Sequence, residues 1–154
     1  MNNSFEKEQP QPEPQPLPLR LFFALAMGTL AMALGAVIWG LVGYFSDKAY
    51  MFIAMAIGMA VAAAVLLPLR PIQKRTALVF LPIILVATLL SVLLGEMLYV
   101  VLFLMRDYQA GLGEAVAAAL DSLGMILLSS DSVMSAILGL IGALAGFFSV
   151  WQRL

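Results

Sequence analysis

Of the chain's 154 residues, 63% are hydrophobic and 11% are charged, and one soluble core of this length could not bury so much apolar surface. The formal net charge of −1 argues against a nucleic-acid partner, and the absence of cysteine and histidine removes disulfides, thiolate metal sites and the commonest general base. We therefore expect a protein solvated by membrane lipids, with no cofactor and no enzymatic activity.

Residues 1–20 differ in composition from the rest of the chain. Proline occupies every second position from Pro10 to Pro18, interleaved mainly with glutamine and glutamate. Such a segment lacks many amide donors, favours an extended conformation and has little to bury. We predict a disordered Pro/Gln-rich cytoplasmic tail. The apolar run after it is too long for the h-region of a signal peptide, so we do not expect cleavage there.

Four long apolar segments follow, at residues 21–45, 49–67, 77–105 and 133–151. About 20 helical residues cross a hydrocarbon core of about 30 Å, and lipid offers the backbone no hydrogen bonds, so each segment is expected to be a helix. Pro82 should kink the third helix or mark its start, and Asp131 or Ser132 should cap the fourth. The sequence predicts an all-α membrane protein with one four-helix transmembrane domain at residues 21–154.

The connection between the third and fourth segments is long enough to hold structure of its own. Within residues 110–128, apolar side chains recur at three- and four-residue steps, at Leu112, Val116, Ala119, Leu120, Leu123 and Leu127. Acidic residues repeat every seventh position on the opposite side, at Asp107, Glu114 and Asp121. This pattern predicts an amphipathic helix that lies along the membrane surface. Its acidic face suits the non-cytoplasmic side, because cytoplasmic leaflets are anionic.

Basic residues predict how the chain is oriented. If the N-terminus is inside, six of the eight Lys and Arg residues are cytoplasmic, namely Lys7, Arg20, Arg70, Lys74, Arg75 and Arg153. Lys48 and Arg106 are then outside. This distribution satisfies the positive-inside rule, so we expect both termini in the cytoplasm.

Glu96 is the one acidic or basic residue within the four apolar segments. It lies about 7–8 Å from the middle of the third segment, towards the outer side, at about 1.5 Å per residue. A carboxyl group inside hydrocarbon costs at least a few kcal/mol, about 2.5–3.5 kcal/mol for a charge at mid-helix, so Glu96 should face the bundle. One hypothesis is a proton- or cation-coupled site, with Tyr99 one turn away as a hydrogen-bond neighbour. The alternative is a protonated glutamic acid bonded to Ser91 or to a backbone carbonyl, or a side chain that reaches the outer interface.

Small residues at helical spacing predict close contacts between helices. They include Gly35 in the first segment, Gly58 in the second, and Gly139, Gly142 and Gly146 in the fourth. Small residues let helix backbones approach each other where no hydrophobic force drives helices together. Two interpretations stay open, packing within the monomer or a homodimer interface.

Two stretches resemble a recurring bacterial membrane domain. Residues 35–45 read GAVIWGLVGYF, and residues 52–61 read FIAMAIGMAV. The first hairpin of that domain reads roughly G-A-x-I-W-x-x-I-x-x-x-T/S, followed by an I-A-x-x-I-G-x-x-V/A-G run. Residues 62–64 are alanines where the family tends to keep a glycine. The resemblance implies an uncharacterised family of four-helix bacterial inner-membrane proteins, and it implies no catalytic residue.

Two functions fit these observations. The first is a structural or accessory membrane protein that assembles with itself or with a larger membrane complex. The second is a small oligomeric proton- or cation-coupled transporter that uses Glu96. We favour the first, because too few polar residues line any helix to form an aqueous path. An enzyme would have to rely on Ser91, Glu96 and Asp131 without a base, so we expect none.

Overall fold

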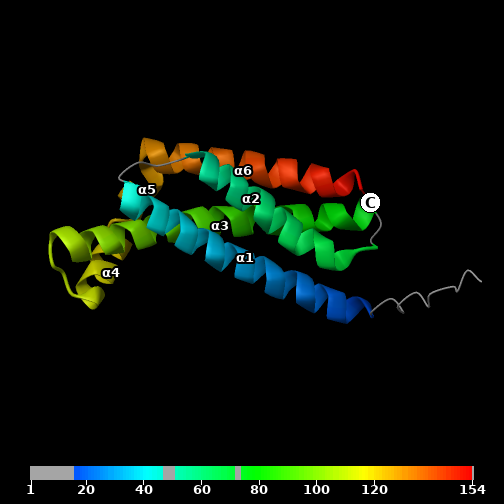
Figure 1. Ribbon diagram of the computed structural model, residues 1–154, viewed down its shortest axis with the longest axis horizontal. Helices are drawn as coiled ribbons and strands as arrows, with labels where there is room; N and C mark the ends of the chain where they lie inside the picture. The colour runs from blue at the N-terminus through cyan, green and yellow to red at the C-terminus, as the bar shows by residue number, and fades with distance from the viewer. Residues whose placement is uncertain (1–15, 47–50, 72–73, 154) are drawn as a thin grey trace, which may run out of the picture.

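The structure, a computed structural model, describes residues 16–46, 51–71 and 74–153, and the regular elements in these ranges are all helices (Figure 1). They are α1 (Leu17–Ser46), α2 (Met51–Leu66), the 3-10 helix η1 (Leu67–Leu69), α3 (Lys74–Asp107), α4 (Leu112–Asp121), α5 (Leu123–Leu128) and α6 (Ser130–Trp151). Four segments are long and apolar enough to cross a membrane: α1, Phe52–Leu69, α3 and α6. The predicted fold class is confirmed.

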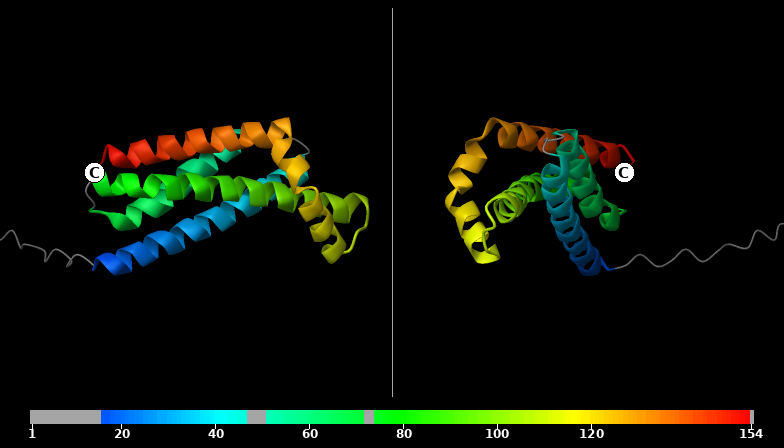
Figure 2. Two further views of the ribbon diagram at one scale, coloured as in Figure 1. Left: turned by 180° about the vertical axis from the view of Figure 1, so that it is seen from behind. Right: turned by 60° about the vertical axis from the view of Figure 1, so that its left-hand side comes forward.

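Two close helix pairs dominate the bundle. α2 packs along α6 and α1 packs along α3, while α3 also contacts α2 and α6. The α1–α3 pair is parallel, because Gly40 meets Gly95 and Gly43, further along α1, meets Tyr99, further along α3. The starts of α1 and α3 and the end of α6 share one end of the bundle, and α4 and α5 lie at the other end (Figures 1 and 2).

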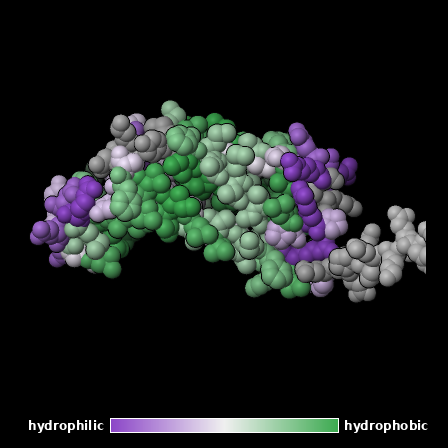
Figure 3. Space-filling model, viewed as in Figure 1, coloured by the Kyte–Doolittle hydropathy of each residue, from purple (hydrophilic) through white to green (hydrophobic). Residues whose placement is uncertain are grey.

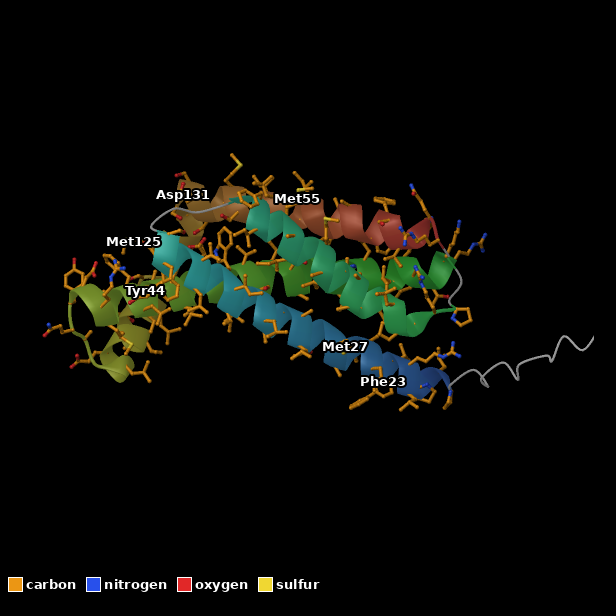
Figure 4. The ribbon with its side chains drawn as sticks, viewed as in Figure 1. Phe23, Met27, Tyr44, Met55, Met125 and Asp131 are labelled. Carbon is orange, nitrogen blue, oxygen red and sulfur yellow. The ribbon has the colours of Figure 1, made fainter. Side chains whose placement is uncertain are left out.

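On the face shown in Figure 3, the middle of the bundle is apolar, and hydrophilic side chains gather towards the two ends. Phe22 on α1 is 65% exposed, and Phe23 and Met27 point away from the other helices (Figure 4). A continuous exposed apolar band of this kind is unfavourable in water and is matched by lipid. The surface therefore agrees with the hydropathy of the four long helices.

The first and third helices begin earlier than predicted. α1 starts at Leu17, so the predicted tail of residues 1–20 overlaps the helix, and residues 1–15 lie outside the described residues. Pro18 fits the first turn because an amide there would have no partner within the helix. α3 starts at Lys74 and continues through Pro82, so that proline does not mark its start.

The fourth transmembrane helix is capped by a residue other than those predicted. α6 starts at Ser130, and the hydroxyl of Ser129 accepts a hydrogen bond from the Ser132 backbone N–H at 3.2 Å. Ser129 is therefore the N-cap, and neither Asp131 nor Ser132 has that position. The earlier start explains the error, because the cap moves with the first helical residue.

The predicted surface helix over residues 110–128 is in fact two helices, α4 and α5. They are separated at Ser122, whose hydroxyl donates to the Ala118 carbonyl oxygen at 2.8 Å. A serine that bonds back to the carbonyl four residues earlier often bends a helix, so this bond accompanies the break. Asp107, which was grouped with the acidic face, belongs to the end of α3.

α4 packs on the protein through alanine rather than leucine. α3 has 34 residues, which at about 1.5 Å per residue exceeds the thickness of the hydrocarbon core. Its late residue Val101 forms a small buried cluster with Ala115 and Ala119 of α4. The larger side chains of α4 stay exposed, at Leu112, Val116 and Leu120. The alanine face therefore meets α3, and the leucine face is left for lipid.

The closest contact between helices joins α2 to α6 through glycine. A Cβ atom at Gly58 would lie 2.1 Å from the carbonyl oxygen of Gly139. A Cβ atom at Gly142 would lie 2.0 Å from the carbonyl oxygen of Met55. Both distances are far inside van der Waals contact with backbone atoms that cannot rotate away. Only glycine permits this approach.

The other two glycines predicted to pack helices also lie at contacts within the monomer. A Cβ atom at Gly146 would lie 2.8 Å from the Cα atom of Met59, and one at Gly35 would lie 2.6 Å from Ile57 and from Ser91. All five predicted packing glycines thus lie between helices of a single chain. This arrangement favours the monomer-packing interpretation over the homodimer interface.

We predict that Gly142→Ala destabilises the bundle by about 1–3 kcal/mol, because a methyl group there forces α2 and α6 apart. Gly113→Ala is the matched control, since nothing lies within 4 Å of a Cβ atom at that helical position. It should leave stability unchanged or raise it by up to about 1 kcal/mol. Unfolding by SDS in mixed micelles, followed by circular dichroism, measures both. Equal stabilities for the two variants would contradict the contact.

Candidate functional site

The polar centre of the bundle is a hydrogen bond between α1 and α3. The indole Nε1 of Trp39 donates to Oε1 of Glu96 at 3.0 Å. Trp39 is 5% exposed, and Glu96 is half-buried. An indole N–H is a donor only, and in hydrocarbon it has no water to bond. This bond therefore satisfies one polar group on each helix at the same time.

Two glycines bring Trp39 to Glu96. A Cβ atom at Gly95 would lie 2.6 Å from Cδ1 of Trp39, and one at Gly40 would lie 2.9 Å from the carbonyl oxygen of Gly95. The backbones of α1 and α3 thus approach closely beside the pair, and the indole lies against Gly95. Since Glu96 directly follows Gly95, this packing places the indole N–H within reach of the carboxyl group.

A second polar bond joins the same two helices. The hydroxyl of Ser91, which is fully buried, donates to the Met32 carbonyl oxygen at 2.8 Å. Ser91 was considered as a partner for Glu96, but its hydroxyl bonds to α1, and the partner of Glu96 is Trp39. The two bonds lie on successive turns of α3, so α1 is held to α3 at two levels.

Tyr99 does not have the position expected of it. No hydrogen bond joins it to Glu96 in the described part of the chain. Its ring packs against Gly43, where a Cβ atom would lie 3.1 Å from Cδ2 of Tyr99. The ring centroid of Tyr99 lies 6.3 Å from that of Phe103 on the same helix. Tyr99 therefore takes part in the packing of α1 on α3 further along both helices, and Trp39 takes its expected place beside Glu96.

Glu96 also lines a cavity of about 330 Å³ between α3, α6 and the end of α5. Ser132 contributes a second polar side chain, and the remaining lining is apolar, including Leu90, Leu127 and Ile137. Glu96 therefore lies between the indole of Trp39 and the cavity. Within residues 16–46, 51–71 and 74–153, no group of three or more acidic side chains is placed to hold a metal ion.

Trp39 is the site residue that sequence reasoning missed, although the chain carries a signal for it. A tryptophan within an apolar transmembrane helix brings an indole N–H into hydrocarbon, where it needs an acceptor. Glu96 is the only carboxyl side chain within the four predicted segments. Matching the donor to the acceptor across helices would have proposed the pair.

The fold and the site define a class: a multi-pass α-helical membrane protein with a carboxyl group bonded inside its bundle. No protein-family model, no curated protein and no solved structure matches the chain. What the protein does is therefore inferred from the contacts of Glu96.

We predict that Trp39→Phe and Glu96→Leu each lower the unfolding free energy by about 1 kcal/mol, because each removes one side of a buried bond. Their effects should not add in the double variant, since the second change has no bond left to break. Glu96→Gln keeps an acceptor oxygen and should stay close to the wild type.

Trp151→Phe is the control for loss of an indole, since the bond to Glu96 uses Trp39. Its effect should add to that of Glu96→Leu. The measurement is the same SDS unfolding in mixed micelles. Additive losses for Trp39→Phe and Glu96→Leu would show that the two side chains do not stabilise each other.

Proposed function

We propose that the protein is a structural or accessory component of the bacterial inner membrane, which assembles with itself or with a larger membrane complex. The bond between Trp39 and Glu96 carries this proposal, because it gives the membrane carboxyl group a structural role between α1 and α3. The Ser91 bond to Met32 serves the same helix pair. These two bonds thus hold α1 to α3, as a scaffold requires.

The surface of α1 supports assembly with neighbours. In its most apolar stretch 22% of residues are buried, against 33–44% in the other three spans. Its outward face carries large apolar side chains along its length, at Phe22, Leu30, Leu34 and Ile38. Such a face can pack against lipid or against another transmembrane helix.

Orientation with both termini in the cytoplasm belongs to the same proposal. Arg20 lies in the first turn of α1, Arg70 follows η1, Lys74 starts α3, and Arg153 follows α6. These helix ends share one end of the bundle, away from α4 and α5 (Figure 1). Concentration of basic residues at one end is typical of a cytoplasmic side.

A second candidate is a small oligomeric transporter coupled to protons or cations. One observation favours it: Glu96 lines a cavity as well as bonding Trp39. A coupling carboxylate needs access to the species it binds, and the cavity offers such access on one side of the bundle. The apolar lining of that cavity makes this candidate the second choice.

We expect native mass spectrometry from lipid nanodiscs to find the protein in an assembly heavier than one 16.5 kDa chain. Glu96→Gln should leave that assembly intact, because the amide oxygen still accepts from Trp39. Gly142→Ala should weaken it by loosening the bundle.

A strictly monomeric mass would contradict the accessory role. A flux into proteoliposomes that responds to a pH gradient, and that disappears in Glu96→Gln, would establish the transporter instead. The two results come from separate measurements, so each candidate can fail without the other.

The lack of cysteine allows a direct test of orientation. Single variants Arg75→Cys and Asp121→Cys place a thiol at opposite ends of the bundle, and both native side chains are exposed. In intact cells a membrane-impermeant maleimide should label Asp121→Cys, and it should label Arg75→Cys only after the membrane is opened. The reverse pattern would overturn the proposed orientation.

A further inference from the structure

We propose that the cavity beside Glu96 binds a lipophilic amine, a molecule with an apolar chain and an ammonium group that pairs with the carboxylate. This inference concerns a ligand site, and it holds whether the protein acts as an accessory subunit or as a transporter. It rests on the free side of Glu96, on the charge around it and on the shape of the cavity.

One oxygen of Glu96 remains for a ligand. Trp39 donates to Oε1, and no hydrogen bond to Oε2 occurs among the described residues. A carboxylate can accept several hydrogen bonds, and a charged group in an apolar site is stabilised when it is both paired and hydrogen-bonded. Because the side chain lines the cavity, a donor in the cavity can reach it.

The local charge selects a cationic donor. Asp131 lies in the first turn of α6, next to Ser132, which also lines the cavity. Arg106, at the outer end of α3, is paired with Asp107, with 2.7 Å between Nε and Oδ1. A neutral chain would leave the carboxylate unpaired, and an anion would be repelled by Glu96 and Asp131. An ammonium group supplies the charge and the donors together.

The cavity has a polar end and an apolar end. α3 runs outward to Glu96, and Leu89 of the lining lies about 10 Å inward of Glu96 along the helix, at about 1.5 Å per residue. α6 runs inward from Ser132, so Leu140 is also nearer the middle. A ligand with its ammonium group at Glu96 would direct its chain towards Leu89 and Leu140. The cavity's volume of about 330 Å³ suits a small amphiphile.

The test uses Trp39 as a built-in reporter, in protein carrying Trp151→Phe so that one tryptophan remains. The protein is placed in nanodiscs of zwitterionic phospholipid and titrated with decylammonium, and separately with decanol, which has the same chain and no charge. Trp39 emission should change saturably with decylammonium, at concentrations at least tenfold below those needed for decanol.

Two variants and one control decide the site. Glu96→Gln keeps the bond to Trp39 and should weaken decylammonium binding roughly ten- to hundredfold, because hydrogen bonds to a charged group are the stronger kind. Ala136→Leu fills the cavity and should abolish binding. Asp121→Asn removes the same charge from an exposed position outside the cavity and should bind as the parent does.

Equal affinity in Glu96→Gln and Asp121→Asn would overturn the proposal, as would equal affinity for decylammonium and decanol. Unchanged binding in Ala136→Leu would show that the amine does not occupy the cavity. Circular dichroism confirms that each variant is folded. If Glu96→Gln does not fold, Ala136→Leu and the comparison of the two ligands still decide the outcome.

Discussion

Lipid removes the hydrophobic force between helices, so this bundle depends on close packing of backbones. The contact between α2 and α6 is the closest, and Gly58 and Gly142 make it possible because neither position has room for a side chain. This contact fixes the position of α6 against α2. Ser132 and Ala136 on α6 are thereby held opposite α3, where they form one wall of the cavity.

Glycine has a different role between α1 and α3. Gly95 leaves space that the indole of Trp39 occupies, and Gly40 lets the two backbones approach beside it. The hydrogen bond from Trp39 to Glu96 follows from this steric arrangement. A carboxyl group that would be costly in hydrocarbon gains a partner because a neighbouring position lacks a side chain.

The helices could be predicted from the sequence more fully than the contacts between them. Hydrocarbon imposes one strong requirement, about 20 apolar residues in helical form, and hydropathy reveals it. The ends were less predictable, because Lys74 and Pro18 are compatible with a first helical turn outside the hydrocarbon. Spacing along one helix suggested Tyr99 as the neighbour of Glu96, but such spacing carries no information on the helix packed opposite. Trp39 could be found only by matching donors to acceptors across helices.

The helices that line the cavity are not packed equally tightly against the rest of the bundle. α3 and α6 belong to the glycine-packed bundle, whereas α5 has six residues, none of them buried, and contributes Leu127 to the lining. α4 is anchored on α3 near Val101, little more than one turn beyond Glu96. α4 is thus attached to α3, the helix that carries Glu96, and α5 after it lines the cavity on the same side. A change in their position would alter access to Glu96 while leaving the contact of α2 with α6 intact.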